Sequence, residues 1–306
     1  MKRAIVTTTI NKVTEAIEQY DKMEDWILIV AGDLKTPSDY SLRRGIYLSP
    51  SDQEAMNKEL SDLIGWNCIQ RRNFALLHAF QLGVEYVCMI DDDNIPLENW
   101  GQKIYLSATD KFRQYETSEI CFDPIGVTDY PHLWHRGFPL ELVPKRKYDI
   151  VTETQIRPGI QANFWNGDPD IDAVCRMEHR PNCLFNFSGF PFTSNSIAPF
   201  NSQNTCISRE VMKDYFLYPH IGRMDDIWAA YYVQALGHRV VFAEPTVLQA
   251  RNPHNLLEDM KKEYIGYENN LRLLSEIRKD PDSINQFLPI RTKEAWKKYK
   301  EILYGL

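Results

Sequence analysis

Long apolar stretches are absent from this sequence. No segment approaches the roughly 18 consecutive apolar residues that a helix needs to cross a bilayer. Near the N-terminus the basic pair Lys2-Arg3 is followed only by Ala4-Ile5-Val6 before three threonines, so the apolar stretch of a signal peptide is missing. We therefore expect no transmembrane segment and a cytoplasmic location.

Several common catalytic motifs are also missing. The sequence contains no G-x-x-x-x-G-K-[ST] phosphate loop, no G-x-S-x-G elbow and no H-E-x-x-H helix. A calcium loop is excluded as well, because an EF-hand loop that starts at Asp168 would need Gly at Ala173 and Glu at His179. The commonest NTPase, hydrolase, zinc-protease and calcium-binding classes therefore do not apply.

Cysteine pairs with metal-binding or redox spacing do not occur either. The sequence has 6 cysteines, none of them in a C-x-x-C pair, and Cys88 falls inside an apolar run. Because free cysteine is among the most often buried residues, we expect all of them to be reduced core residues. They are Cys68, Cys88, Cys121, Cys175, Cys183 and Cys206.

Basic residues are too few for a nucleic-acid-binding surface. The chain has 35 Lys and Arg against 42 Asp and Glu, a formal net charge of -7, whereas nucleic-acid binding normally requires clustered positive charge. Its 43% hydrophobic and 12% aromatic residues are typical of a folded globular protein. The length of 306 residues allows two small domains or one large α/β domain.

Hydrophobic patterning in the first 90 residues predicts an α/β fold. Apolar runs at 4–9 and 26–30 indicate buried strands on either side of a helical pattern over 11–23. A second helix, over 67–82, precedes a third apolar strand over 86–90. This alternation of strands and helices is typical of a parallel sheet.

The rest of the chain has weaker patterns. Residues 150–164 alternate like a strand, and a helix over 225–236 lies between short strands at 205–211 and 239–242, the latter followed by strand-like residues 246–248. After Asn255 the chain becomes charged and helical. Its amphipathic end suits packing, a partner or peripheral membrane contact, through the side chains Trp296, Tyr299, Ile302 and Leu303.

Three consecutive carboxylates, Asp91, Asp92 and Asp93, follow the apolar strand 86–90 directly. Ligands in open α/β sheets bind beyond the carboxyl ends of the strands, which is where this cluster is expected. Neighbouring carboxylates repel one another unless a cation lies among them. Mg²⁺ or Mn²⁺ prefers such oxygen ligands and can bridge to a diphosphate, so we expect a divalent metal here.

Two further pairs of acidic residues are candidates for catalysis or sugar binding. Asp225 and Asp226 open a predicted helix, where one carboxylate can cap free N–H groups and the second is left to act as a base or to bind sugar hydroxyls. We assign the chemistry to Asp226 and a helix-terminal or substrate-orienting role to Asp225. Asp168 and Asp170 belong either to a turn or to a sugar-binding site.

Four motifs together resemble a known group of proteins. They are Ile90-Asp91-Asp92-Asp93, Arg136-Gly137-Phe138-Pro139-Leu140, Ile221 to Ala229 around Asp225-Asp226, and Asn252-Pro253-His254-Asn255-Leu256 followed by Lys261-Lys262-Glu263. In order and approximate spacing, over residues 84–264, they resemble the reversibly glycosylated polypeptides of plants, which are UDP-arabinopyranose mutases, and the STELLO-type putative glycosyltransferases. The chain departs from the mutases at Asn94, where these usually have Cys.

The resemblance implies a GT-A, Rossmann-like fold that binds a nucleoside diphosphate sugar, such as a UDP-sugar. It implies a metal site formed by Asp91, Asp93 and His254, and an essential arginine at Arg136, which in the mutase group becomes glycosylated. It also implies donor-binding side chains, which are Thr7, Thr8, Thr9, Asn11, Asp33, Arg71 or Arg72, Asp91 and Asp92. Apart from the resemblance, we assign sugar or acceptor binding to Asp168, Asp170 and Asn204.

We therefore expect one large GT-A domain over 1–255 with a mixed, mainly parallel sheet. Residues 1–110 would bind the nucleotide, 111–255 the sugar and acceptor, and 256–306 would form a helical C-terminal extension. The predicted activity is metal-dependent transfer of a sugar to a glycan or lipid-linked acceptor. Two alternatives stay open: a sugar-nucleotide mutase, and a catalytically silent partner protein that only binds the sugar nucleotide.

Overall fold

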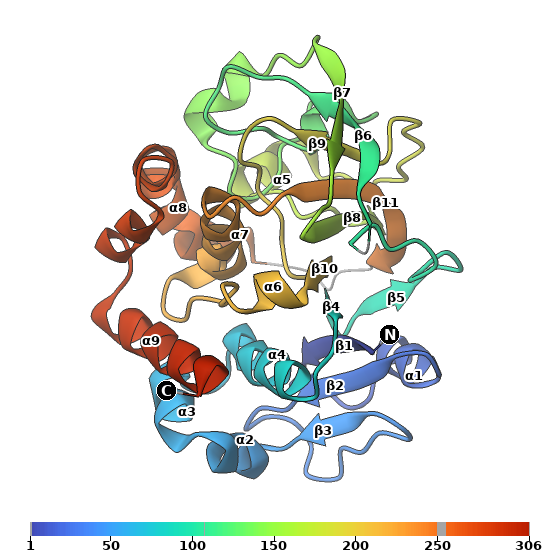
Figure 1. The fold of residues 1–306 in the computed structure, drawn as a ribbon, viewed down its shortest axis with the longest axis vertical. Helices are drawn as coiled ribbons and strands as arrows, with labels where there is room; N and C mark the ends of the chain where they lie inside the picture. Colours follow the sequence, from blue (N-terminus) through green and yellow to red (C-terminus); the bar gives the residue numbers. More distant parts are fainter. Residues whose placement is uncertain (1, 107, 250–254, 306) are drawn as a thin grey trace.

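Eleven strands form one mixed sheet in the order β3-β2-β1-β4-β10-β8-β11-β9-β6-β7, and β5 pairs with β11. The computed structural model describes residues 2–106, 108–249 and 255–305, with helices packed around this sheet (Figure 1). The strands are β1 Arg3–Thr8, β2 Ile27–Ala31, β3 Ile46–Leu48, β4 Tyr86–Ile90, β5 Asn94–Pro96, β6 Asp110–Tyr115, β7 Val151–Ile156, β8 Ile160–Gly167, β9 Phe192–Ser194, β10 Asn204–Ser208 and β11 Val240–Gln249.

Helices lie in some of the connections between strands and after the last strand. The α-helices are α1 Glu15–Asp21, α2 Pro50–Met56, α3 Lys58–Ile64, α4 Arg72–Gln81, α5 Ala173–His179, α6 Arg209–Met212, α7 Asp225–Ala235, α8 Leu256–Ile277 and α9 Ile290–Tyr304. Short 3-10 helices are η1 Ile69–Arg71, η2 Ile125–Val127, η3 Leu140–Lys145, η4 Gly222–Met224 and η5 Pro281–Gln286.

The N-terminal part of the sheet is parallel. β1 pairs in parallel with both β2 and β4, and β2 pairs in parallel with β3. Every residue of β4 is buried, which matches its unbroken apolar sequence and the way parallel sheets are covered on both faces. The α/β class and the strand–helix–strand order predicted from the first 90 residues are confirmed.

β10 reverses direction in the middle of the sheet. It is antiparallel to β4 on one side and to β8 on the other, whereas β8 and β11 are parallel to each other. β6, β7 and β9 extend the sheet away from β1–β3, as Figure 1 shows. The sheet is therefore mixed and runs through both predicted halves of the domain, whose boundary stays a prediction.

Some predicted boundaries need correction. The helix expected from residue 11 begins only at Glu15, because the Thr14 side chain accepts a hydrogen bond from the Ile17 N–H and caps α1. Residues 150–164 form two strands, β7 and β8, because Pro158 and Gly159 interrupt the pattern. The two short strands expected at 239–242 and 246–248 are one strand, β11, with a register shift inside it.

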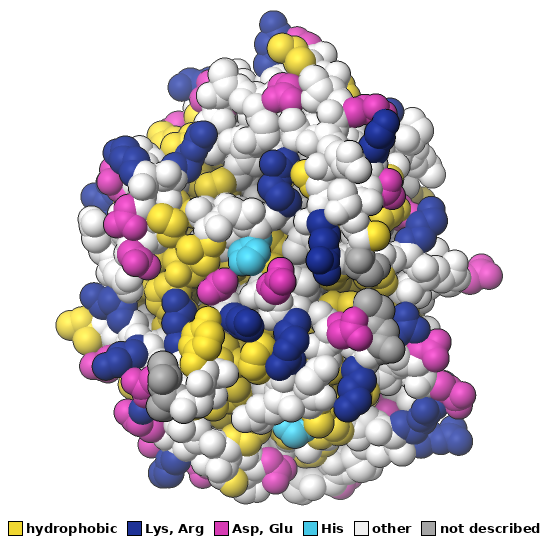
Figure 2. Space-filling view, viewed as in Figure 1, with side chains coloured by type: hydrophobic (Ala, Val, Ile, Leu, Met, Phe, Trp, Pro, Cys, Tyr) yellow, Lys and Arg dark blue, Asp and Glu magenta, His cyan; other side chains and the backbone are white. Residues whose placement is uncertain are grey.

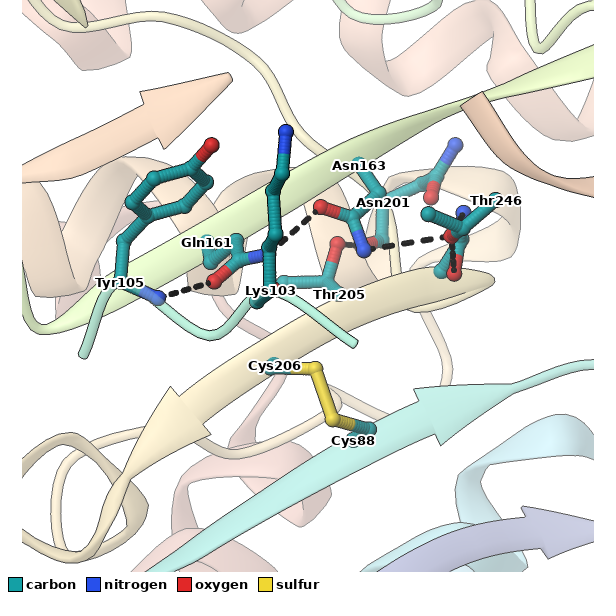
Figure 3. Close-up of a disulfide and its surroundings, with 10 residues drawn as sticks. Cys88, Lys103, Tyr105, Gln161, Asn163, Asn201, Thr205, Cys206 and Thr246 are labelled. Atoms are coloured by element: carbon teal, nitrogen blue, oxygen red, sulfur yellow. Dashed lines mark hydrogen bonds between the residues drawn. A yellow bond between two sulfur atoms is a disulfide. The ribbon is translucent and has the colours of Figure 1, made fainter. Parts of the chain in front are cut away.

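Cys88 and Cys206 form a disulfide, which corrects the expectation that all 6 cysteines are reduced. The two residues are direct partners in the antiparallel pairing of β4 with β10, and Figure 3 shows the bond joining these strands. They are 118 residues apart in sequence, so no local pattern predicts the pair. The other four cysteines are free, and all of these except Cys68 are buried.

The C-terminal region is helical, as expected, and α9 packs onto the body of the molecule. The Trp296 ring meets the rings of Tyr218 and Tyr232 edge to face, with centroids 5.3 and 4.8 Å apart, and Tyr299 is buried against Phe216. The apolar face of α9, for which the sequence suggested packing, a partner or a membrane, therefore packs against the rest of the chain. Within the described ranges, no helix combines the length and apolarity needed to span a membrane.

Candidate active site

The carboxyl ends of the parallel strands bring several predicted site residues together. In register, Thr8 of β1 lies opposite Ala31 of β2, and Val6 lies opposite Met89 of β4, so the strands end at one edge of the sheet. Thr9, Asp33 and Asp91 follow β1, β2 and β4 at this edge. This is the position at which open α/β sheets bind ligands.

The three consecutive carboxylates have different partners. Asp91 Oδ1 forms an ion pair of 2.7 Å with Arg72 Nη2. Asp92 Oδ2 accepts hydrogen bonds from the Thr9 hydroxyl and, at 3.0 Å, from Asn11 Nδ2. Asp93 lines a cavity together with Asp91. The side chains therefore point to two separate spaces on either side of the chain after β4.

The first space is a hollow of about 290 Å³. Asp33 is buried and shapes its wall, because its carboxylate accepts hydrogen bonds from the N–H groups of Asn67 at 2.8 Å and Cys68 at 3.1 Å. Thr7 is buried within β1 and does not line this hollow. The lining residues are Thr8, Thr9, Ile10, Asn11, Asn67, Cys68, Ile69 and Asp92.

The two neighbouring arginines have different surroundings. Arg72 is buried beside the site, where it donates to Asp91 and to the carbonyl oxygen of Ser202 at 2.6 Å. Arg71 donates to Gln53 Oε1 at 2.8 Å, and its guanidinium lies 3.6 Å from the ring centroid of Trp66. These contacts hold Arg71 in the core, whereas Arg72 lies beside Asp91, so Arg72 is the better placed of the two for the predicted phosphate contact.

The second space is a cavity of about 210 Å³ that shares Ile69 with the first. The segment after β4, the end of β11, the loop before β10, the η4 turn and the start of α7 all contribute to it. It gathers four of the predicted carboxylates and the predicted arginine. The lining residues are Ile69, Asp91, Asp93, Arg136, Ser202, Gln203, Gly222, Arg223, Asp225, Asp226 and Gln249.

Arg136 is buried between two carboxylates. Its Nε donates to Asp170 Oδ1 at 2.9 Å, and its Nη2 donates to Asp170 Oδ2 at 2.8 Å and to Asp226 Oδ2 at 3.1 Å. Its Nη1 donates to Asp226 Oδ1 at 3.0 Å and to the carbonyl oxygen of Arg223. A guanidinium has five N–H groups, so every donor of Arg136 has an acceptor. Arg136 is therefore a clamp that holds Asp170 and Asp226.

Asp225 and Asp226 occupy different environments. Asp226 accepts from Arg136 and from the Ser202 N–H at 3.0 Å, whereas Asp225 Oδ2 accepts from Gln70 Nε2 at 2.6 Å. Burial and the neighbouring Asp226 charge raise the pKa of Asp225 to about 7. Asp225 is the first residue of α7 and lines the cavity. Its carboxylate also accepts a hydrogen bond from the backbone N–H of Asp226, so the helix-terminal role that the sequence suggested stays a prediction.

The predicted sugar- or acceptor-binding residues separate into three groups. Asp170 belongs to the clamp around Arg136. Asp168 does not line the cavity and pairs with Arg176 at the start of the turn. Asn204 is buried in β10, where its Nδ2 donates to the Phe164 carbonyl oxygen at 2.8 Å, so it supports the sheet below the site and does not line it.

The donor set near Asp91 and Asp93 fits a hard divalent ion that shares its shell with phosphate. Such ions are commonly bound by one or two carboxylates, waters and substrate phosphates instead of a complete protein cage. Among the residues that the structure describes, no group of three or more His, Cys, Asp and Glu side chains is arranged around one position. His254, the predicted third ligand, lies outside the described residues.

Several residues of this cavity could not be identified from the sequence. Gln70 holds Asp225, Ser202 holds Asp226, and Arg223 lies between Asp170 and a carboxylate of α8, Glu263. Gln70 is 155 residues from Asp225 in sequence, so only the fold brings them together. Arg223 and Glu263 belong to motifs that carried the family resemblance, which is the one signal that pointed to them.

Comparisons with known proteins agree with the resemblance to STELLO proteins. No model of a known protein family matches the chain. It is similar to two probable glycosyltransferases of Arabidopsis thaliana, STELLO2 (24% identical) and STELLO1 (26% identical), each over 183 residues. The matched region is 56% of this chain and 24% of each relative, so the chain spans about a quarter of the length of these proteins.

Among solved structures, the chain resembles glucosyl-3-phosphoglycerate synthase of Mycobacterium tuberculosis. The complex with Mn²⁺, UDP and phosphoglyceric acid matches with a TM-score of 0.48 and 14% identity, over 88% of this chain and 78% of the other. The complex with Mn²⁺, UDP-glucose and phosphoglyceric acid matches with a TM-score of 0.46 and 14% identity, over 89% and 80%. The mixed α/β sheet and the helical C-terminal region described above match the fold class that the sequence predicted.

Proposed function

We propose that this chain is a glycosyltransferase that uses a nucleoside diphosphate sugar, such as a UDP-sugar, as donor. The observation that carries the proposal is the pair of adjoining spaces on either side of Asp91–Asp93 at the carboxyl edge of β1, β2 and β4. The first suits a base and ribose, and the second suits a sugar between charged side chains. The similarity to proteins named as probable glycosyltransferases supports the same activity.

The charge of the second space supports a metal-assisted donor site. Its wall carries Asp91, Asp93, Asp225 and Asp226 against the two cations Arg136 and Arg223. A diphosphate would meet like charge there unless a cation bridges it to the carboxylates. Asp91 and Asp93 would hold Mn²⁺ or Mg²⁺, which neutralises the charge that grows on the leaving diphosphate.

Asp225 is the residue that we assign to proton transfer, in place of Asp226. The Asp226 carboxylate is occupied by Arg136 and Ser202, whereas Asp225 has a pKa of about 7 and faces the cavity. In transfer, an acceptor hydroxyl oxygen bonds to the anomeric carbon, the bond from that carbon to the diphosphate oxygen breaks, and Asp225 takes the hydroxyl proton. The acceptor class we propose is a glycan or lipid-linked hydroxyl.

The engagement of Arg136 favours transfer over mutase chemistry. In the mutase group the matching arginine becomes glycosylated, which needs a guanidinium nitrogen that can attack a sugar. Each N–H of Arg136 is donated to Asp170, Asp226 or the Arg223 carbonyl, and the side chain is 4% exposed. This arrangement supports a structural role for Arg136 in holding the site.

A donor screen tests the proposal. The protein is incubated with Mn²⁺ and a panel of nucleoside diphosphate sugars, with and without glycan acceptors, and free nucleotide and the sugar product are quantified. We expect nucleotide release that rises when the right acceptor is added. Ring interconversion of the sugar without an acceptor would establish the mutase instead, and binding without turnover of any donor would establish the silent partner protein.

A further inference from the structure

The long helix of the C-terminal region lies directly against the candidate active site. Figure 1 shows α8 beside α7, and the η4 turn that leads into α7 packs against α8. A Cβ added to Gly222, in η4, would collide with the Lys262 carbonyl oxygen, and one added to Gly266, in α8, would collide with the Met224 sulfur. The turn that carries Arg223 is therefore fitted to the surface of α8.

One acidic side chain of α8, Glu263, connects this helix to two parts of the site. The carboxylate is 1% exposed. Its Oε1 accepts from Arg223 Nε at 2.9 Å, and its Oε2 accepts from the Ala173 N–H at 2.8 Å and from the Tyr267 hydroxyl at 2.6 Å. A carboxylate can accept several hydrogen bonds at once, and this one joins η4, the start of α5 and α8 itself.

Both parts that Glu263 holds are attached to the Arg136 clamp. Arg223 lines the cavity, its carbonyl oxygen accepts from Arg136 Nη1, and its own guanidinium lies 3.9 Å from Asp170 Oδ1. Ala173 is the first residue of α5 and follows Asp170 after only two residues. Displacing either partner of Glu263 therefore displaces an acceptor of Arg136, and with it the position of Asp226.

We propose that Glu263 is a positioning residue for the sugar-transfer site, acting through Arg223, so that α8 is an integral part of the catalytic domain. The proposal rests on the proposed function for its catalytic consequence. Glu263 touches no reacting group. The Glu263 carboxylate holds the guanidinium of Arg223 and the start of α5. These two parts in turn hold the acceptors of Arg136 in place. Loss of Arg223 would leave the buried carboxylate of Glu263 without its charged partner, whereas Arg223 has two further carboxylates, Asp170 and Asp259, within 4 Å.

The test is a double-mutant cycle with a matched control. The variants are Glu263→Gln, Arg223→Gln, the pair together, and Glu258→Gln, which removes a carboxylate from the same helix at a 51% exposed position paired with Lys261. Sugar transfer is measured as kcat and KM. We expect Glu263→Gln to lower kcat by ~10-fold or more with KM within about 3-fold, Glu258→Gln to match wild type, and the double variant to lose clearly less than the sum of the two single losses. Additive losses in the double variant would overturn the proposal.

Amide hydrogen exchange separates this proposal from the proposed function, because it needs no turnover. In Glu263→Gln we expect faster exchange at residues 171–174 and 222–226 and unchanged exchange in β1, β2 and β4. Unchanged exchange at both segments would overturn the positioning role even in an active enzyme. Faster exchange there in a protein that turns over no donor would uphold the positioning role and reject the transferase.

Discussion

Asp225 and Asp226 are adjacent in sequence, but the fold gives them different chemistry. Asp226 is tied to a guanidinium that uses all of its donors, and these hydrogen bonds hold its carboxylate in one position. Asp225 has a single strong side-chain partner, the neutral amide of Gln70, and opens onto the cavity. Sequence alone could not rank the two, because their partners are brought in from distant segments.

The first prediction concerns these two side chains. Asp225→Asn should lower sugar transfer by ~10²-fold while leaving nucleotide affinity nearly unchanged, since it removes only the proton acceptor. Asp226→Asn should instead lower stability, by about 3–5 kcal/mol, because a buried partner of Arg136 is lost. Transfer assays, nucleotide titration and urea unfolding measure the three effects. Full transfer activity in Asp225→Asn would show that the proton acceptor lies elsewhere.

The raised pKa of Asp225 also predicts a pH effect on stability. A carboxyl whose pKa rises to about 7 on folding binds its proton more tightly in the folded chain, so it stabilises the fold at low pH. That contribution is lost as the pH rises from about 4 to 7, at up to about 1.4 kcal/mol per pH unit. Asp172, whose pKa burial also raises to about 7, contributes in the same window.

Asp225→Asn should therefore flatten the loss of stability between pH 5 and 7 without abolishing it. Urea unfolding in EDTA at pH 5, 6, 7 and 8 measures the slope. Asp149→Asn, at a position where the side chain is 74% exposed, serves as the control and should keep the wild-type slope. A slope in Asp225→Asn equal to that of wild type would contradict the assigned environment of Asp225.

At the scale of elements, the sequence predicted those strands that are defined by a local hydrophobic pattern. The apolar runs before Thr9, Ala31 and Asp91 became β1, β2 and β4, because unbroken apolar sequence is what a strand buried on both faces requires. The sequence also placed Asp91–Asp93 correctly at a strand end. The continuous β11, the disulfide and the Glu263–Arg223 contact depend on partners far away in the chain, which no local pattern records.

The packing of α9 gives a prediction at the same scale. Trp296→Ala should lower the free energy of unfolding by about 3–5 kcal/mol, because the ring is 5% exposed between Tyr218 and Tyr232. Ile290→Ala, on the same helix but 71% exposed, should change it by less than about 0.5 kcal/mol. Urea unfolding distinguishes them. Equal effects would mean that the apolar face of α9 is not packed as described.

Over the whole molecule, charge and shape agree with a small anionic ligand. Figure 2 shows acidic and basic side chains interspersed across one face, without the continuous basic surface that nucleic acid would need. The carboxylates that line the second cavity lie together at one edge of the sheet, and the strands of this sheet come from both halves of the chain. Local patterns predicted that Asp91–Asp93 follow a buried strand, whereas the contacts of Arg136 with Asp170 and Asp226 needed the fold.

The central claim is that a metal joins the Asp91–Asp93 segment to a nucleoside diphosphate. Calorimetric titration of UDP into the protein, with Mn²⁺ and then with EDTA, tests it directly for wild type, Asp93→Ala and the exposed control Asp149→Ala. We predict binding at least ~10-fold weaker in EDTA for wild type and control, and weak binding in both conditions for Asp93→Ala. Equal affinity with Mn²⁺ and with EDTA, or unchanged binding in Asp93→Ala, would contradict the account.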